Sequence, residues 1–121
     1  MPLLYNITKA HGFFAGKYIV FEFQIVDRAG VAQDISGWAL GWEMFEEGAK
    51  AGSDPLIAKA TGAGIQTTNG PGGICQVTVA VADTTALQGK RYWHELFRTD
   101  TGFEGLITYG TVELQASLSR V

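Results

Sequence analysis

The amino-acid sequence predicts an all-β sandwich, on three observations. Several short segments alternate apolar and polar residues with a period of two, which puts alternate side chains on opposite faces of a strand. Asp-x-x-Gly turns separate these segments, at Asp27–Gly30 and Asp34–Gly37. About seven such segments follow one another at short spacing with a single helical signal between them, an arrangement typical of two packed antiparallel sheets.

Composition predicts one folded domain over residues 1–121. The chain of 121 residues is 46% hydrophobic and 17% charged, which is ordinary for a globular domain with one core. Nine basic against 12 acidic residues give a net charge of -3, without a cluster of Lys or Arg. Nucleic-acid binding is therefore not expected, because it depends on clustered basic residues that displace counterions from phosphates.

The start of the chain, Met1-Pro2-Leu3-Leu4-Tyr5, lacks the basic segment and long apolar stretch of a secretory signal. No apolar run approaches the length that crosses a membrane. We expect a soluble product released into the cytoplasm, with no membrane association. Cys75 is the single cysteine. It is expected to be a small buried hydrophobe, and no intrachain disulfide can form.

The first half of the chain predicts four strands and a short extended piece. Trp38 opens the clearest one-sided pattern, in which large apolar side chains share one face while Gly41 and Glu43 lie on the other. An aperiodic connection follows over residues 46–55. The expected strands are Leu3 to Thr8, Lys17 to Asp27, Trp38 to Phe45 and Leu56 to Thr61, and Gly62-Ala63-Gly64-Ile65 then turns into the short extended piece.

The second half predicts three more strands and one helical turn. The strand from Ile74 to Val81 has Cys75, Val77, Val79 and Val81 on one face. One short helical turn is expected near Asp83-Leu87, because Asp83 can cap free amides and Leu87 can fold back onto the core. Strands at residues 92–99 and 106–115 are expected to form a hairpin, since the turn Asp100-Thr101-Gly102 joins them.

This hairpin contains the candidate binding site, a protein interface. Val112 and Leu114 place even-numbered positions of the last strand toward the core, and Tyr92, His94 and Leu96 are expected to face the same core. The outward side chains would then form an apolar patch rich in aromatic rings, of a kind that often marks protein interfaces. Alternatively, a register slip of one residue, or cover from the first strand or a loop, buries this patch within the chain. The outward residues are Trp93, Glu95, Phe97, Ile107, Tyr109 and Thr111.

The ordered set of motifs resembles a family of small immunoglobulin-like proteins of tailed bacteriophages and prophages. That family includes the N-terminal domain of phage baseplate upper proteins. The matching parts are Phe21-x-Phe23 with Asp27-x-x-Gly30, Asp34-Ile35-Ser36-Gly37-Trp38, Gly64-Ile65 with Gly73-x-x-x-Val77-x-Val79, Asp83-x-x-Ala86-Leu87, Gly89-x-x-Tyr92 and Gly110-Thr111-Val112. The resemblance implies an immunoglobulin-like antiparallel β-sandwich, and a virion component that attaches other proteins to a tail or baseplate.

One strand departs from the family pattern. After Gly89, such sequences commonly have Tyr-hydrophobe-Tyr-acid-Leu-acid-Leu, whereas this chain has Tyr92-Trp93-His94-Glu95-Leu96-Phe97-Arg98. Two outward positions have thus become large aromatic residues. This difference points to a surface particular to this protein.

Other candidate sites favour structural interpretations. His11 and His94 lack ligand spacing to each other or to Cys75, so no metal site is expected. No catalytic motif and no cofactor motif is present, and an enzyme is not expected. The tryptophans Trp38 and Trp42 could form a sugar-stacking platform, but their apolar neighbours favour core packing.

Taken together, the sequence predicts a non-enzymatic phage structural or adaptor protein of the tail, baseplate or neck. It would be made in the host bacterial cytoplasm and reside in the virion. Its expected partners are other virion proteins, in a homo- or hetero-oligomer. The alternatives are a head-decoration protein of the same fold, and a β-sandwich carbohydrate-binding module that contacts the host surface.

Overall fold

The structure is a computed structural model that describes residues 3–117; nearly half of them lie in strands, and only a few are helical. The all-β class is therefore confirmed. A 3-10 turn, η1 (Lys9–His11), and a single α-helical turn, α1 (Val81–Thr84), are the helical pieces in this range. The strands are β1 (Leu3–Leu4), β2 (Ile19–Gln24), β3 (Leu40–Glu46), β4 (Ile57–Thr61), β5 (Gly64–Asn69), β6 (Ile74–Val79), β7 (Arg91–Arg98) and β8 (Gly105–Glu113).

These strands form one mixed sheet of eight strands in the order β1-β8-β7-β3-β4-β5-β6-β2. Most neighbours are antiparallel, but β1 runs parallel to β8 and β4 runs parallel to β5. The expectation of purely antiparallel pairing is wrong at these two contacts. The short extended piece expected to follow from Gly62-Ala63-Gly64-Ile65 is a full strand, β5, which brings the total above the expected seven or so.

The parallel contact of β4 with β5 arises from the short connection between them. Only Gly62 and Ala63 separate the two strands, and Gly62 has a φ of +84°, which favours glycine. After this turn β5 continues in the direction of β4, and the strands pair over two positions. β5 in turn pairs antiparallel with β6, so the same sheet continues from β4 into the second layer.

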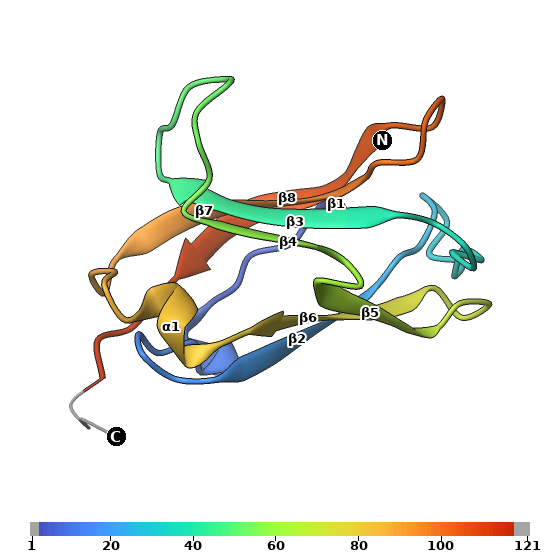
Figure 1. The fold of residues 1–121 in the computed structure, drawn as a ribbon. Coiled ribbons are helices and arrows are strands. Elements are labelled where there is room, and N and C mark those ends of the chain that lie inside the picture. The colour runs from blue at the N-terminus through green and yellow to red at the C-terminus, as the bar shows by residue number, and fades with distance from the viewer. Residues whose placement is uncertain (1–2, 118–121) are drawn as a thin grey trace.

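The sheet curls so that its two ends face each other across the core (Figure 1). One layer contains β1, β8, β7 and β3, and the other contains β5, β6 and β2. The expected inward alternation is confirmed in β2, β6 and β7, whose alternate residues are buried. The core therefore lies between the layers, and the second face of the β3-β7-β8 layer points away from it.

A buried polar chain fixes the centre of the core. The indole Nε1 of Trp42 donates a hydrogen bond to Nδ1 of His94 (3.1 Å), and both side chains are fully buried. Because the indole can only donate, Nδ1 is the acceptor and the imidazole proton sits on Nε2. Nε2 then donates to the backbone oxygen of Tyr5 (2.5 Å). His94 thus ties β3 and β7 to the N-terminal segment.

The N-terminal segment follows β8 closely. The backbone amides of Tyr5 and Ile7 donate to the carbonyl oxygens of Tyr109 and Thr111, each at 2.8 Å. Gly110 permits this approach, because a Cβ there would overlap the backbone oxygen of Tyr5. The N-terminal segment therefore runs parallel to β8 and covers its edge. The sequence did not predict which strand would pair there.

The Asp-x-x-Gly segments are turns, as predicted. In the first, Oδ1 of Asp27 accepts the amides of Ala29 (2.8 Å) and Val31 (3.0 Å). In the second, Oδ1 of Asp34 accepts the amide of Ser36 (2.9 Å). Hydrogen bonds from Ser36 hold the pKa of Asp34 below its ordinary value. The aspartate side chain thus satisfies amides that the turn leaves unpaired.

The helical turn lies slightly before its expected place. It begins at Val81, and Val81 is 51% exposed instead of sharing the core face of β6. The strand ends at Val79 because the backbone turns at Ala80, whose amide donates to Oδ2 of Asp83 (2.7 Å). Leu87 packs against the core as expected. No helix within residues 3–117 is long and apolar enough to cross a membrane.

Cys75 is expected to be chemically inert in the folded protein. It is fully buried, and burial, followed by the charge of Glu22, raises the pKa of its thiol to about 11. At pH 8 the native protein should therefore not react with Ellman's reagent over minutes, because the reactive thiolate is absent. The guanidinium-unfolded chain should release one equivalent of chromophore.

The matched control is Ala29→Cys, which adds an exposed thiol in a turn. That variant should release one equivalent in the native state. Rapid modification of the native wild type would show that Cys75 is accessible.

Candidate functional site

The candidate site is the face of β3, β7 and β8 that points away from the core, called here the outer face. The strand pairing places Trp93 opposite Phe45, and Glu95 opposite Glu43. Across the other side of β7, Glu95 lies opposite Tyr109. Directly paired residues share a face, so the alternation predicted for β7 places its aromatic residues here. The outer face consists of Gly41, Glu43, Phe45, Trp93, Glu95, Phe97, Tyr109 and Thr111.

Most of the predicted interface residues therefore lie together. Trp93, Glu95, Phe97 and Tyr109 are half-buried, neither in the core nor fully exposed. The Trp93 and Tyr109 rings lie 5.5 Å apart between centroids, at an angle of 33°. The two rings thus pack against each other on the outer face.

Ile107 does not follow the expectation, because it packs against the core. The register of the hairpin shifts between Leu96 and Phe97, where Leu96 pairs with Thr108 and Phe97 with Leu106. The extra residue in β8 breaks the alternation of side chains at this point. Ile107 instead lines an apolar hollow of about 210 Å³ together with Leu3, Tyr5 and Phe23, and other residues.

Phe97 is held by a glycine in the neighbouring strand. Gly41 lies opposite Phe97, and a Cβ at Gly41 would overlap the Phe97 ring. The ring thus occupies the space that a side chain at position 41 would fill. This packing explains the glycine within β3, a position that otherwise weakens a strand.

A hollow of about 750 Å³ opens at one end of the outer face. The β3–β4 loop, residues 47–56, stands above the sheet (Figure 1). Its residues 47–53 line one side of the hollow. Two turns shape this loop: Ala49 donates its amide to Glu46 (3.1 Å), and Ser53 donates its amide to Lys50 (3.0 Å). The floor is formed by Glu43, Phe45, Trp93, Glu95 and Thr111.

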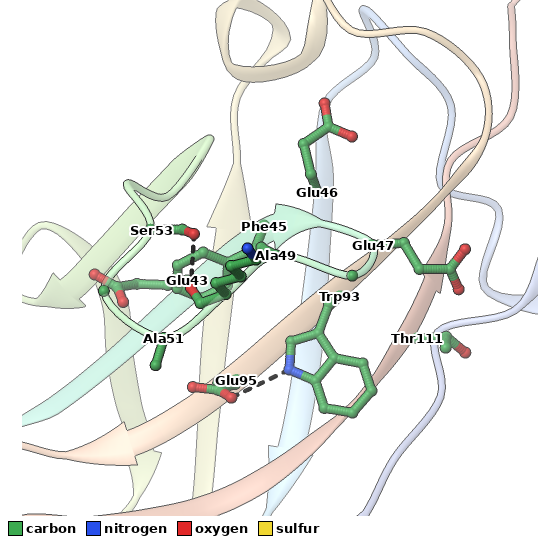
Figure 2. A pocket seen from close by; sticks show the side chains of 13 residues that line it. Glu43, Phe45, Glu46, Glu47, Ala49, Ala51, Ser53, Trp93, Glu95 and Thr111 are labelled. Carbon is green, nitrogen blue, oxygen red and sulfur yellow. Dashed lines mark hydrogen bonds between the residues drawn. The ribbon is translucent and has the colours of Figure 1, made fainter.

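Two carboxylates stand beside the aromatic rings of the hollow. Nε1 of Trp93 donates to Oε2 of Glu95 (3.1 Å), as Figure 2 shows. Burial raises the pKa of Glu43 because it removes hydration from the carboxylate. The negative charge of Glu95 raises it further and is the smaller of the two causes. In the part of the chain that the structure describes, no ion pair reaches either carboxylate.

The remaining acidic residues of the hollow already have cationic neighbours. Glu46 accepts from Nζ of Lys90 at 2.7 Å, and Glu47 lies 3.4 Å from Nε of Arg91. Both pairs lie at the exposed rim. The negative charge inside the hollow is therefore that of Glu43 and Glu95.

Sequence reasoning missed Phe45, Glu43 and the loop as parts of the site. Glu43 had been placed on the face away from the core, which is correct. Nothing in the sequence indicated that β3 lies beside β7, so its outward residues could not be joined to Trp93. The β3–β4 loop has no periodic pattern of apolar residues in the sequence. Its part in the site appears only in the structure, where it lines the hollow.

Both histidines are engaged in contacts within the chain. His11 accepts the amide of Thr8 on Nδ1 (3.0 Å), and its Nε2 lies 3.1 Å from the Tyr5 hydroxyl. His94 is occupied by Trp42 and Tyr5. Within residues 3–117, no three His, Cys, Asp or Glu side chains are grouped so that they could hold a metal ion.

The tryptophans considered as a sugar platform do not form one. Trp42 is fully buried in the core. Trp38 is half-buried, and the guanidinium of Arg98 covers its ring at 4.0 Å from the centroid. Phe103 stacks on the same guanidinium at 4.6 Å, and Oδ2 of Asp100 accepts from Nη2 (3.0 Å). The pair Trp38 and Trp42 is therefore engaged within the chain.

Comparison of the chain with protein-family models and with curated proteins gives no match.

Proposed function

We propose that this protein is a non-enzymatic structural or adaptor subunit of a tailed-bacteriophage virion, placed at the tail, baseplate or neck. The ordered motifs from Phe21 to Val112 that resemble the phage family support this role. The observation that carries it is the outer face. Four aromatic side chains, Phe45, Trp93, Phe97 and Tyr109, are only half-buried there and lie outside the buried core.

The proposed fold is an immunoglobulin-like sandwich used as a rigid support. The pairing of β3, β7 and β8 fixes the spacing of the aromatic rings, so little side-chain freedom is lost on docking. Repeated copies in a particle would strengthen weak single contacts by raising the effective concentration of neighbours. The partners are other virion proteins, in a homo- or hetero-oligomer, and the subunit resides in the virion.

Two alternatives make different demands. A head-decoration protein of the same fold would use the same face on a capsid lattice. A carbohydrate-binding module would need exposed rings beside a groove, and the pair first considered is engaged within the chain. Trp93 and Phe45 in the hollow are the rings that such a module would have to use.

The test is the double replacement of Trp93 and Phe97 by serine. Each ring is half-buried, so the loss of burial should cost about 1 kcal/mol of unfolding free energy per residue, and the fold should persist. Incorporation into particles should fall at least tenfold when the variant replaces the wild type in the phage that encodes it. Quantitative blotting of purified particles measures this, and thermal unfolding measures stability.

Tyr18→Ser is the matched control, because this tyrosine is 64% exposed and lies just before β2 in the opposite layer. It should leave incorporation unchanged. A large loss of stability in the double variant with normal incorporation would contradict the proposal. Glycan-array binding by the isolated wild type would favour the carbohydrate alternative.

A further inference from the structure

The hollow combines two chemical features that match one kind of ligand group. Trp93 and Phe45 supply aromatic rings, and Glu43 and Glu95 supply carboxylates beside them. Aromatic faces attract cations through the ring quadrupole, and carboxylates pair with cationic donors. A group that is both positively charged and flat satisfies both features at once.

The chain itself holds such a group at the other end of the same layer. The guanidinium of Arg98 contacts the rings of both Trp38 and Phe103, at 4.0 Å and 4.6 Å from their centroids. Its Nη2 donates to Asp100 (3.0 Å). Two rings and a carboxylate thus bind an arginine within this fold. The hollow presents rings and carboxylates without an arginine.

Two of the carboxylates in the hollow have no cationic partner among the described residues. Among the described residues, Glu46 and Glu47 have basic partners, whereas no ion pair reaches Glu43 or Glu95. The two carboxylates are directly opposite each other on β3 and β7, where like charges destabilise the pairing. Lys50 also lines the hollow, but forms no ion pair within this part of the chain.

We propose that the hollow binds an arginine side chain that a partner protein of the virion presents on an extended segment. The guanidinium stacks on Trp93 and donates hydrogen bonds to Glu43 and Glu95. The flanking residues of the segment lie on the aromatic outer face toward Phe97. This proposal rests on the proposed function, and adds to it the chemistry that selects the partner.

Arginine fits better than lysine on the same observations. Its planar guanidinium offers five donors in a fixed fork and stacks on aromatic rings, whereas the ammonium of lysine is a compact, strongly hydrated charge. Two carboxylates on neighbouring strands can each accept from one edge of the fork. A lysine side chain should therefore also bind in the hollow, but more weakly than arginine.

The experiment titrates the intact protein with a short extended peptide that contains one arginine. The matched peptides contain lysine or citrulline, which keeps the shape of arginine without its charge. Amide and indole signals in two-dimensional NMR report the site and the dissociation constant. The arginine peptide should shift the Trp93 indole signal, and the citrulline peptide should bind at least tenfold more weakly, with lysine between them.

Charge-removing variants should change the affinity for the arginine peptide in opposite directions. Glu43→Gln and Glu95→Gln should each weaken arginine binding by about fivefold to tenfold, because each removes one acceptor charge. Lys50→Gln should strengthen it by about twofold, because it removes the competing cation. Glu22→Gln, the same charge change on β2 in the opposite layer, should have no effect.

Equal binding of the arginine and citrulline peptides would overturn the proposal in favour of purely apolar docking. Binding of a neutral oligosaccharide at the Trp93 indole, without binding of the arginine peptide, would overturn it in favour of a glycan site. The titration needs no phage. Suppose that the arginine peptide does not bind, while the Trp93 and Phe97 double variant still incorporates poorly into particles. That result would refute only the arginine chemistry. Normal incorporation of that variant would refute the proposed function.

Discussion

Replacing His94 with alanine should lower the free energy of unfolding by about 4 kcal/mol. The side chain is fully buried, and its removal leaves a cavity between β3 and β7. It also leaves the Trp42 indole without an acceptor and the Tyr5 carbonyl without a donor. An unpaired buried polar group costs about 1–3 kcal/mol in addition to the cavity. Denaturant unfolding followed by tryptophan fluorescence measures the loss.

A double-mutant cycle separates the hydrogen bond from the cavity. Trp42→Phe keeps most of the ring volume and removes the donor to His94. If the bond matters, the two substitutions together should cost less than the sum of the single losses. Additive losses, or a loss below about 1 kcal/mol for His94→Ala, would show that the buried chain contributes little.

The same histidine should make stability depend on pH. Burial lowers the pKa of His94, while the bond to Tyr5 and the charge of Glu95 oppose that shift. The unfolded chain therefore takes up this proton below about pH 6.5, and the folded chain only at lower pH. Stability should fall as pH is lowered from 7.5 to 5. The decrease should be smaller in His94→Gln, and an equal decrease in both proteins would contradict the assignment.

Replacing Gly73 with alanine should cost at least about 3 kcal/mol. Gly73 has a φ of +72°, and a Cβ there would lie 2.6 Å from the backbone oxygen of Ile25 and 2.7 Å from that of Gln33. These oxygens belong to the backbone and cannot rotate away. The Gly73 carbonyl also accepts the amide of Ile25 at 2.7 Å. The added methyl group should therefore push apart the end of β2 and the start of β6.

Gly37→Ala is the matched control for this effect. Gly37 has a similar φ of +78°, but open space surrounds its missing Cβ. Its substitution should lower the free energy of unfolding by only about 1–2 kcal/mol, the cost of placing alanine in the left-handed conformation. Equal losses at the two positions, measured by thermal or chemical unfolding, would show that the close approach to Ile25 is unimportant.

Local patterns in the sequence predicted much of the fold. Alternation in β2, β6 and β7 gave the buried faces correctly, and the Asp-x-x-Gly turns form as expected. These features depend on neighbouring residues, because a strand alternates its side chains wherever it lies in the sheet. The same argument identified Trp93, Glu95 and Phe97 as outward residues.

Features that depend on distant residues escaped prediction. The β-bulge beside Phe97 moved Ile107 toward the core, and no residue type in β8 marks such an insertion. The parallel position of the N-terminal segment depends on Gly110, whose role appears only when Tyr5 lies against it.

By itself, then, the sequence determined an all-β chain, the inward and outward side of most strands, and the aromatic character of the hairpin. Only the tertiary structure decided that β3 lies beside β7, that Glu43 meets Glu95, and that the β3–β4 loop encloses them with Trp93. The physical reason is that the period of a strand is local, whereas many strand orders satisfy the same alternation. Which strands become neighbours depends on how the whole core packs.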